Sequence, residues 1–564
     1  MTKIVSTATS NGNGILGKDD GDVRAAAATA AVDVQVQVPL FKVRTITAFI
    51  TLQASDFEPV GYHNNSPYND NNSEHTTRTT VTTKVELKIK HTVSALEKIR
   101  EQLTSTASSS SSAASSSKAY EVQTIRIATN PFPEYLLPST NSTSTSTSTS
   151  TNNKNKSVLN NVLEERLHLL DACLEHYGIQ FFSLGCASSV EEVHYCTRIL
   201  EFSTKFSCSV QLQANDTQVA TAAADTILRN SKLQQIGCTS RKRSRIDDDT
   251  AAPPPADGLA NFRFCVANVT PYIPFFPAAK AASAHSTDTT TDDTTASDDN
   301  TLFVVRFAIG FENGTLLKHL LMNDANQTIE QIVPPPRRPS GTTMDSNFAA
   351  GFTTAVRPIQ TICQQVVSDW NNSNNASNNV SSNDTTTNDS TLVQLVYMGL
   401  DASMNPSLDK EGSIASAIEV LQEIPTNQFG GPGTVAAVAA MTTAIQTRLG
   451  NDDTDPIKLT GYNGLMLPLC EDTRLAQLAT AHQLHIKDLL LLSSVCGVGI
   501  DTVPLPGNTS VTELSAFLLD VVGLAARWSK PLSCRVFPVP HKVAGDTTTF
   551  ESPYLVNCKI VALS

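Results

Sequence analysis

Long hydrophobic runs, closely spaced cysteine pairs and an excess of basic residues are missing from this sequence of 564 residues, and each absence excludes a class of protein. Every uninterrupted apolar segment is shorter than the roughly 18 residues that a membrane span needs, so we expect no membrane partner. The 54 acidic residues outnumber the 41 basic ones, and the formal charge of −13 argues against nucleic acid as a partner. The first 40 residues carry charges without a continuous apolar core, so no secretory signal is visible.

The 11 cysteines are scattered along the chain, and no two of them are spaced as CxxC. This pattern is typical of neither a zinc finger nor a small disulfide framework. An odd number of cysteines in a large chain suits a reducing compartment. We therefore expect a cytoplasmic protein.

Polar low-complexity segments account for much of the length. They contain too little apolar surface to offset the entropy lost on ordering, so we predict that they are disordered insertions. The predicted organisation is a disordered leader, residues 1–40, and one α/β domain, residues 41–564. The predicted insertions are approximately 63–82, 104–118, 138–157, 239–258, 281–300, 334–346 and 371–390.

Between these insertions, β-branched runs alternate with runs of helical periodicity. Strands are predicted at 43–52, 122–128, 179–184, 207–212, 262–269, 302–309, 392–400, 533–539 and 555–561. Helices are predicted at 84–103, 159–177, 189–200, 219–229, 414–421 and after 434, and at 489–492 and 510–528. Capping boxes, Ser189 with Glu192 and Ser510 with Glu513, begin two of the helices, and the predicted inner face of the second one includes Trp528. The alternation indicates parallel strands joined by helices, which is an α/β fold.

The stretch 493–507 combines a thiol, a carboxylate, glycines and prolines, and we interpret it as a rigid turn that presents polar groups. Cys496 is a candidate nucleophile there, against the alternative of a small buried apolar side chain. Asp501, Asp401 and Glu312 each follow or end an apolar run and are candidate catalytic carboxylates. Asp401 and Asp501 are also the candidate ligands of a divalent metal. The alternative is that both aspartates accept backbone hydrogen bonds at turns.

Residues 429–434 resemble an anion cradle, because glycines free the backbone at the start of a helix. A tight connector without a ligand explains the same residues. Lys542, Arg44 and Arg126 are candidates for neutralising an acidic ligand, against a solvated surface position for each. The candidate anion-binding residues are Gly430, Gly431, Gly433, Thr434, Asn463 and Lys542.

Several motifs together resemble an uncharacterised family known as domain of unknown function 711. They are VRTIT (43–47), IRIATNPF (125–132), PYIPFFPAA (271–279), LDASMNPS (400–407), FGGPGT (429–434), GYNGLMLP (461–468), CGVGIDTVPLPG (496–507) and FPVPHKVAGDTTTFESPYLVN (537–557). The resemblance implies a ten-stranded α/β barrel similar in shape to pyruvate formate lyase and ribonucleotide reductase. The chain departs from the family at Lys280, where relatives continue with an aromatic residue and a histidine. It also lacks a glycyl-radical motif, so no glycyl radical is expected.

We expect the site at one end of this barrel, lined by the loops 271–279, 310–314, 401–407, 430–434, 461–468 and 496–507. The leading hypothesis is an enzyme that acts on a small anionic metabolite by carboxylate acid–base or metal-assisted chemistry. The alternatives are a non-catalytic metabolite sensor and, third, a structural or oligomer-forming protein. Whether the protein is an enzyme, which cofactor it uses and whether it forms a homo-oligomer stay open at this point.

Overall fold

The computed structural model describes residues 40–58, 83–105, 119–138, 151–233, 256–284, 302–322, 328–333, 347–378, 391–449 and 456–563. The predicted leader and most of the predicted insertions lie outside these ranges. Two helices run into predicted insertions: α3 (Thr151–His176) begins within 138–157, and α8 (Asn347–Asn378) ends within 371–390.

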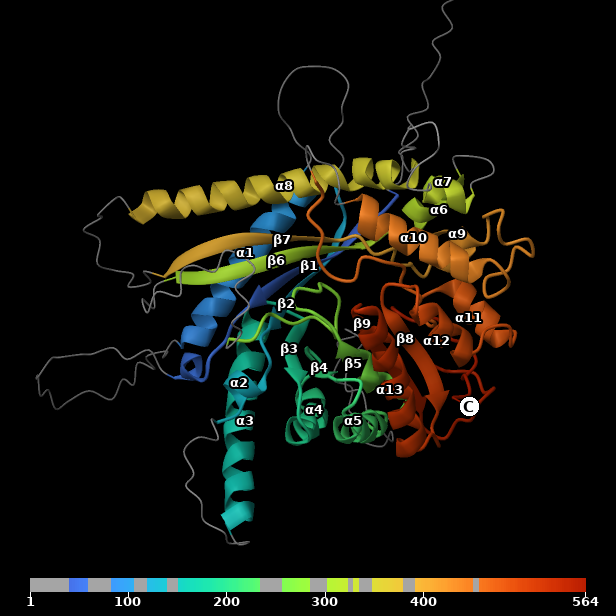
Figure 1. The fold of residues 1–564 in the computed structure, drawn as a ribbon. Helices are drawn as coiled ribbons and strands as arrows, with labels where there is room; N and C mark the ends of the chain where they lie inside the picture. Colours follow the sequence, from blue (N-terminus) through green and yellow to red (C-terminus); the bar gives the residue numbers. More distant parts are fainter. Residues whose placement is uncertain are drawn as a thin grey trace, which may run out of the picture. The chain divides into compact units, whose positions relative to one another are not determined.

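Nine strands in the described part of the chain form one mixed, mostly parallel sheet (Figure 1). The order is β7-β6-β1-β2-β3-β4-β5-β9-β8, in which β1 to β5 are parallel neighbours. The flanking pairs β6–β7 and β8–β9 are each parallel within themselves, but β6 is antiparallel to β1 and β9 to β5. The strands are β1 (Lys42–Ile50), β2 (Val122–Thr129), β3 (Phe182–Ala187), β4 (Phe206–Gln211), β5 (Phe264–Asn268), β6 (Leu302–Glu312), β7 (Leu392–Asp401), β8 (Gly499–Pro506) and β9 (Leu532–Val539).

Helices cover one face of this sheet (Figure 1). α1 (Lys84–Thr104) packs on β1 and β2 and touches α8, which packs on β7. α13 (Val511–Trp528) packs on α5 (Thr217–Asn230), β5 and β9. Both predicted capping boxes are confirmed, at the starts of α4 (Val190–Phe202) and α13. The other α-helices of the described part are α2 (Pro133–Leu136), α6 (Gly314–Met322), α7 (Ile329–Ile332), α9 (Ile414–Ile418), α10 (Thr434–Arg448), α11 (Thr473–Thr480) and α12 (Ile486–Ser493). Within the described ranges, no helix combines the length and the apolar composition that crossing a bilayer requires.

The other face of the sheet is covered by an irregular segment, residues 269–281, rather than by a helix. Side chains alternate between the two faces of a strand, so Ile46 and Ala48 join the helix-covered core while Thr47 points to the segment. The Thr47 hydroxyl donates a hydrogen bond to the carbonyl of Pro274 at 2.8 Å, and the Ser183 hydroxyl donates to that of Ala279 at 2.7 Å. These bonds satisfy two backbone carbonyl groups of the irregular segment, which belongs to no helix or strand.

A second irregular segment, residues 459–469, is hydrogen-bonded to both edge strands. Leu459 forms a parallel bridge with Leu400 at the end of β7, and Leu465 forms a second parallel bridge with Met404, three residues beyond that strand. On the other side, the Leu469 amide donates to the carbonyl of Asp501 in β8 at 3.0 Å. The described residues nevertheless hold nine strands rather than the predicted ten, and a closed barrel is not shown.

The asparagine-rich end of α8 is ordered because it serves the open edge of β7. Asn371 exchanges hydrogen bonds with both backbone groups of Leu395, and Asn374 donates to the carbonyl of Val393. An unpaired strand edge exposes backbone donors and acceptors, which these side chains satisfy. Composition alone predicted disorder for 371–390, and the contact with the strand edge explains why residues 371–378 are helical instead.

Three other local predictions are corrected by the structure. Residues 499–506 are strand β8, so the predicted rigid turn is confined to the residues before Gly499. Residues 555–561 form no strand beyond one bridge between Lys559 and Thr547, because their partners are loop residues. Trp528, predicted for the inner face of α13, is 54% exposed at the last position of the helix.

Candidate functional site

A cleft of about 530 Å³ lies at the amino ends of β1 to β5. The carboxyl end of β6 reaches the same place because β6 is antiparallel to β1. The segment 269–281 contributes a wall of aromatic and proline side chains, residues 275–278. Of the predicted site loops, all except 430–434 supply residues to this cleft.

Five charged side chains of alternating sign form a continuous series of ion pairs along the cleft, which we call the ion chain. Arg44 binds Glu471 at 2.7 Å and reaches Glu312 at 3.6 Å. Glu471 is bound through its other oxygen by Arg535, also at 2.7 Å. Arg535 then holds Asp501 through two bonds, at 2.6 and 3.0 Å. The members come from β6, β1, the segment before α11, β9 and β8, so these ion pairs link the β6–β1 side of the sheet to its β9–β8 side.

Burial and charge act in opposite directions on these groups. Burial by itself would lower the pKa of Arg535, yet the carboxylates of Asp501 and Glu471 raise that pKa above its usual value. Burial raises the pKa of Asp501, and the Arg535 guanidinium offsets part of that rise. The arrangement keeps Arg535 charged while its two carboxylates stay desolvated but paired.

Arg126 differs from Arg44 and Arg535 because, among the described residues, no carboxylate lies within ion-pair distance of it. Its guanidinium lies 5.0 Å from the ring centre of Phe181 and 5.3 Å from that of Phe276, and its Nε donates to the Thr124 hydroxyl at 2.9 Å. Burial, together with the positive charge of Arg44, lowers the pKa of Arg126 to about 9. The side chain is still charged at neutral pH, so the cleft contains a cation that lacks a counter-ion in the described protein.

A second polar group in the cleft wall is also without a partner. The hydroxyl of Ser207, at the start of β4, is buried and has no hydrogen-bond partner within the described ranges. Buried hydroxyls are usually hydrogen-bonded, so an unpartnered one beside a cleft points to a ligand. The Cys265 thiol also lines the cleft, and burial raises the pKa of Cys265, which keeps the thiol protonated.

The structure brings two of the predicted catalytic residues, Asp501 and Glu312, into the cleft. Asp401 is not among the lining residues and is completely buried. Its carboxylate accepts hydrogen bonds from Ser403, Tyr462 and Asn463, which is the turn-capping arrangement. Burial raises the pKa of Asp401 against the effect of these bonds. Across the described ranges, no group of three His, Cys, Asp or Glu side chains could hold a metal ion.

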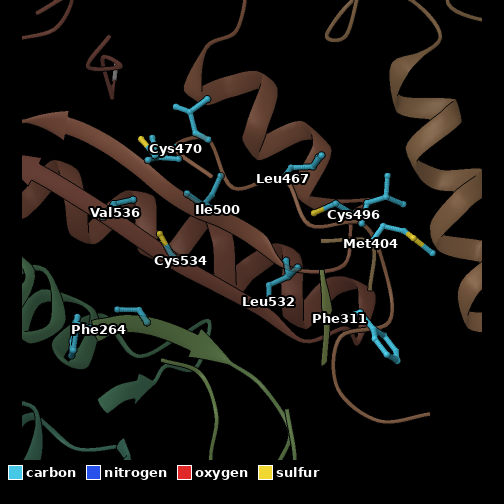
Figure 2. Packing of buried hydrophobic residues seen from close by; sticks show 14 of the residues in the cluster. Phe264, Phe311, Met404, Leu467, Cys470, Cys496, Ile500, Leu532, Cys534 and Val536 are labelled. Carbon is cyan, nitrogen blue, oxygen red and sulfur yellow. The ribbon is translucent and has the colours of Figure 1, made fainter. Parts of the chain in front are cut away.

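Cys496 lies in the hydrophobic core, where Figure 2 shows it among buried side chains that include Met404 and Leu467. The neighbouring Gly497 permits close approach, but to the protein itself. A Cβ atom added at Gly497 would lie 2.6 Å from the Cα atom of Gly464. The glycines of the predicted turn therefore serve the packing of two chain segments.

The candidate anion-binding residues lie outside the cleft. In the glycine-rich segment, the Gly430 amide donates to the Thr434 hydroxyl at 3.0 Å, and Gly433 is the N-cap of α10. Gly431 is enclosed by the same turn, beside Thr426. The Asn463 side chain accepts from the Ala402 amide at 3.0 Å. Lys542 donates to the Thr547 carbonyl at 2.6 Å in an exposed position.

Sequence reasoning missed Glu471, Arg535 and Ser207 as site residues. One signal was available for Arg535, because it is the only charged residue in the strand 532–539. A buried charge in such a strand requires partners. For Ser207, the local sequence contains no comparable signal.

Comparison with known proteins places the chain in a group without a stated activity. Residues 71–551 match the model of a family described as "Uncharacterised ACR (DUF711)". A "UPF0210 protein" from Oenococcus oeni is 33% identical over 151 residues, which is 27% of this chain and 32% of that protein. Proteins of the same name from Lactiplantibacillus plantarum and Limosilactobacillus reuteri are 30% and 32% identical, each over 27% of this chain and 32% of the relative. The matched region thus spans about a third of the length of these curated relatives.

Proposed function

Because the chain belongs to the DUF711 family, whose description states no activity, we propose a function from the cleft itself. The cleft binds a small anionic metabolite with Arg126 as its counter-charge, and the protein is an enzyme that acts on this metabolite by acid–base chemistry. The observation that carries the proposal is the charged Arg126, held between two rings and without a carboxylate partner among the described residues.

A carboxylate or phosphate fits this position for a physical reason. A guanidinium presents parallel N–H donors that match the oxygens of either group, and such charge-assisted bonds are strong where water is excluded. The Ser207 hydroxyl is available in the same cleft as a donor or acceptor. The rings of Phe181 and Phe276 restrict the guanidinium before the ligand arrives, which lowers the entropy lost on binding.

Glu312 is the carboxylate best placed to exchange a proton with the ligand. The nitrogen–oxygen distance of its ion pair with Arg44 is 3.6 Å, while the other ion pairs of the ion chain measure 2.6 to 2.7 Å. Its side chain is 17% exposed, and Gln123 is a further hydrogen-bond partner. A general base must lie within hydrogen-bond reach of the proton that it takes, and a loosely paired carboxylate on the cleft wall is free to turn toward a ligand. Asp501 is held by two bonds from Arg535, so we assign it the role of fixing that arginine.

The second candidate function is a sensor that binds the same metabolite without converting it. A sensor pocket would be mostly closed and apolar, whereas the alternating charges of this cleft favour an enzyme. The two functions share the binding step and differ in turnover. Incubating the protein with any ligand it binds, followed by mass spectrometry of the ligand, separates them.

The test of the binding step is titration calorimetry with a panel of small carboxylates and phosphates. We expect Arg126→Gln to weaken binding by about 10- to 100-fold, because a hydrogen bond to a charged group contributes roughly 1.5–3 kcal/mol. Arg527→Gln is the matched control, since Arg527 stacks on the Trp528 ring at 4.8 Å outside the cleft. Equal affinities of wild type and Arg126→Gln for every ligand would end the proposal.

We also propose that residues 459–469 act as a tenth strand that joins β7 to β8 and closes the sheet into a barrel. The hydrogen bonds of this segment to both edge strands support that topology. Amide hydrogen exchange tests this topology. The Leu469 amide donates to the Asp501 carbonyl and the Gly497 amide to the Leu465 carbonyl, so both amides should exchange as slowly as those of β8. Fast exchange at both amides would instead indicate two open edges.

A cytoplasmic location is proposed on chemical grounds. All ten cysteines in the described ranges are free and buried, which suits a reducing compartment. Microscopy of a fluorescent fusion tests the location. Light scattering on the purified protein decides whether it forms a homo-oligomer.

A further inference from the structure

Two buried thiols face each other beside the cleft. The sulfur atoms of Cys470 and Cys558 lie 3.7 Å apart, although the residues are 88 positions apart in the chain. Cys470 directly precedes Glu471 of the ion chain, and it lies within the buried core (Figure 2). Cys558 follows the segment that supplies Pro553 and Tyr554 to the cleft wall.

The backbone holds this pair in place on both sides. The Val556 amide donates to the carbonyl of Cys470 at 2.7 Å, so the two chain segments run side by side. The Cys470 amide donates to the Thr502 hydroxyl at 3.2 Å, and the Cys558 amide donates to the Thr548 hydroxyl at 3.1 Å. A disulfide needs its sulfur atoms about 2 Å apart, so bond formation requires the two side chains to move together from the present 3.7 Å.

We propose that Cys470 and Cys558 are a redox modification site, where a peroxide oxidises the two thiols to a reversible disulfide. The first thiol gives up its proton and its sulfur attacks one oxygen of the peroxide, which forms a sulfenic acid and one water molecule. The second thiol then attacks that sulfur and releases a second water molecule. Overall, two thiols and one hydrogen peroxide give one disulfide and two water molecules, and the peroxide accepts the two electrons.

Cys558 reacts first, because it lies on the segment with access to solvent. Its neighbour Asn557 is exposed, as are Glu551, Pro553 and Tyr554. Local opening of this short segment brings the Cys558 thiol to the surface without unfolding the sheet. Cys470 is completely buried, and burial and the adjacent thiol raise the pKa of Cys470, so it serves as the resolving thiol inside the protein.

The disulfide would join two walls of the cleft. It ties the segment that carries Tyr554 to the residue that precedes Glu471, so the cleft can open less. Ligand entry and release should therefore be slower in the oxidised protein than in the reduced protein. This consequence, unlike the disulfide itself, rests on the proposed function of the cleft.

The experiment uses the full-length reduced protein and hydrogen peroxide. After oxidation, free thiols are alkylated, the protein is digested, and peptides are identified by mass spectrometry. We expect a cross-linked pair of peptides containing Cys470 and Cys558 that lacks two hydrogen atoms and separates on treatment with dithiothreitol. Cys558→Ser should abolish this product, while Cys363→Ser, a substitution at a distant buried cysteine, should leave it unchanged.

The outcomes are decided on the wild-type protein, so they do not depend on the folding of a variant. Alkylation of both Cys470 and Cys558 after oxidation would overturn the proposal, as would a cross-link at the neighbouring pair Cys196 and Cys208 instead. Binding to the reduced protein tests the proposed function of the cleft separately. A cross-link between Cys470 and Cys558 in a protein that binds no ligand would support the disulfide proposal and refute only the proposed function of the cleft.

Discussion

Replacing Arg535 by methionine tests whether the cleft depends on its buried ion chain. Arg535 is 8% exposed and binds Asp501 and Glu471, whose side chains are only 13% and 5% exposed. Methionine keeps much of the volume but leaves both carboxylates without this partner. Removing one member of a buried ion pair typically destabilises a protein by about 3–5 kcal/mol. Glu471 keeps its bond to Arg44, so we expect a loss near the lower value, about 3 kcal/mol at neutral pH.

The stability lost in Arg535→Met should become smaller as the pH falls. Burial already raises the pKa of Asp501, and without Arg535 only the charge of Arg44, which does not bind Asp501, opposes that rise. At pH values between the pKa of Asp501 in the unfolded chain and its raised pKa in the folded variant, the folded variant binds more protons than the unfolded chain does. Its stability therefore rises as the pH is lowered through this window, by up to about 1.4 kcal/mol per pH unit. Urea unfolding at neutral and at mildly acidic pH, followed by tryptophan fluorescence, measures both effects.

The matched control is Arg229→Met. Arg229 pairs with Asp225 on the exposed side of α5, with the arginine side chain 60% exposed. Exposed pairs of this spacing contribute about 0.3–0.5 kcal/mol, so this variant should unfold almost like wild type at every pH. If Arg535→Met loses no more stability than Arg229→Met, or if its loss does not vary with pH, the reasoning from burial is wrong.

Two further predictions concern residues that sequence reasoning placed in the site. Gly464→Ala should destabilise the fold by about 1–3 kcal/mol in thermal unfolding, because its new Cβ atom would lie 2.5 Å from the Cα atom of Gly497. Gly523→Ala, where the space is open, should be neutral or slightly stabilising, and equal effects of the two changes would contradict the packing argument. Asp401→Asn should lower stability by about 1–3 kcal/mol, because an amide group accepts fewer of its four hydrogen bonds. Calorimetry should show unchanged ligand affinity in that variant, and a loss of affinity at full stability would restore Asp401 as a site residue.

The elements of the fold were predictable where a single local pattern decides them. The capping box of Ser510 and Glu513 places the start of α13, and the apolar run 392–400 places β7. Prediction failed where a distant partner decides. The asparagines at the end of α8 read as an insertion by composition, yet they bond to β7, which follows them in the chain.

The candidate site was predictable as a set of loops but not as a set of side chains. Most of the predicted loops reach the cleft, because strand ends that neighbour one another in a sheet gather at its edge. Which polar residue points into the cleft depends on packing around it. Asp401 and Asp501 both lie at strand residues that looked equivalent, yet one is enclosed by backbone donors and the other faces Arg535.

By itself, the sequence determined the alternation of strands and helices, the capped helix starts and the family to which the chain belongs. These features depend on residues a few positions apart, which local periodicity and motifs record. Only the tertiary structure decided the ion chain and the unpaired Arg126. Arg44 and Glu471 are 427 positions apart, and no local pattern records that an antiparallel β6 and β9 bring such residues together. The charges of the cleft are a property of the sheet order, because that order alone determines which side chains share one buried space.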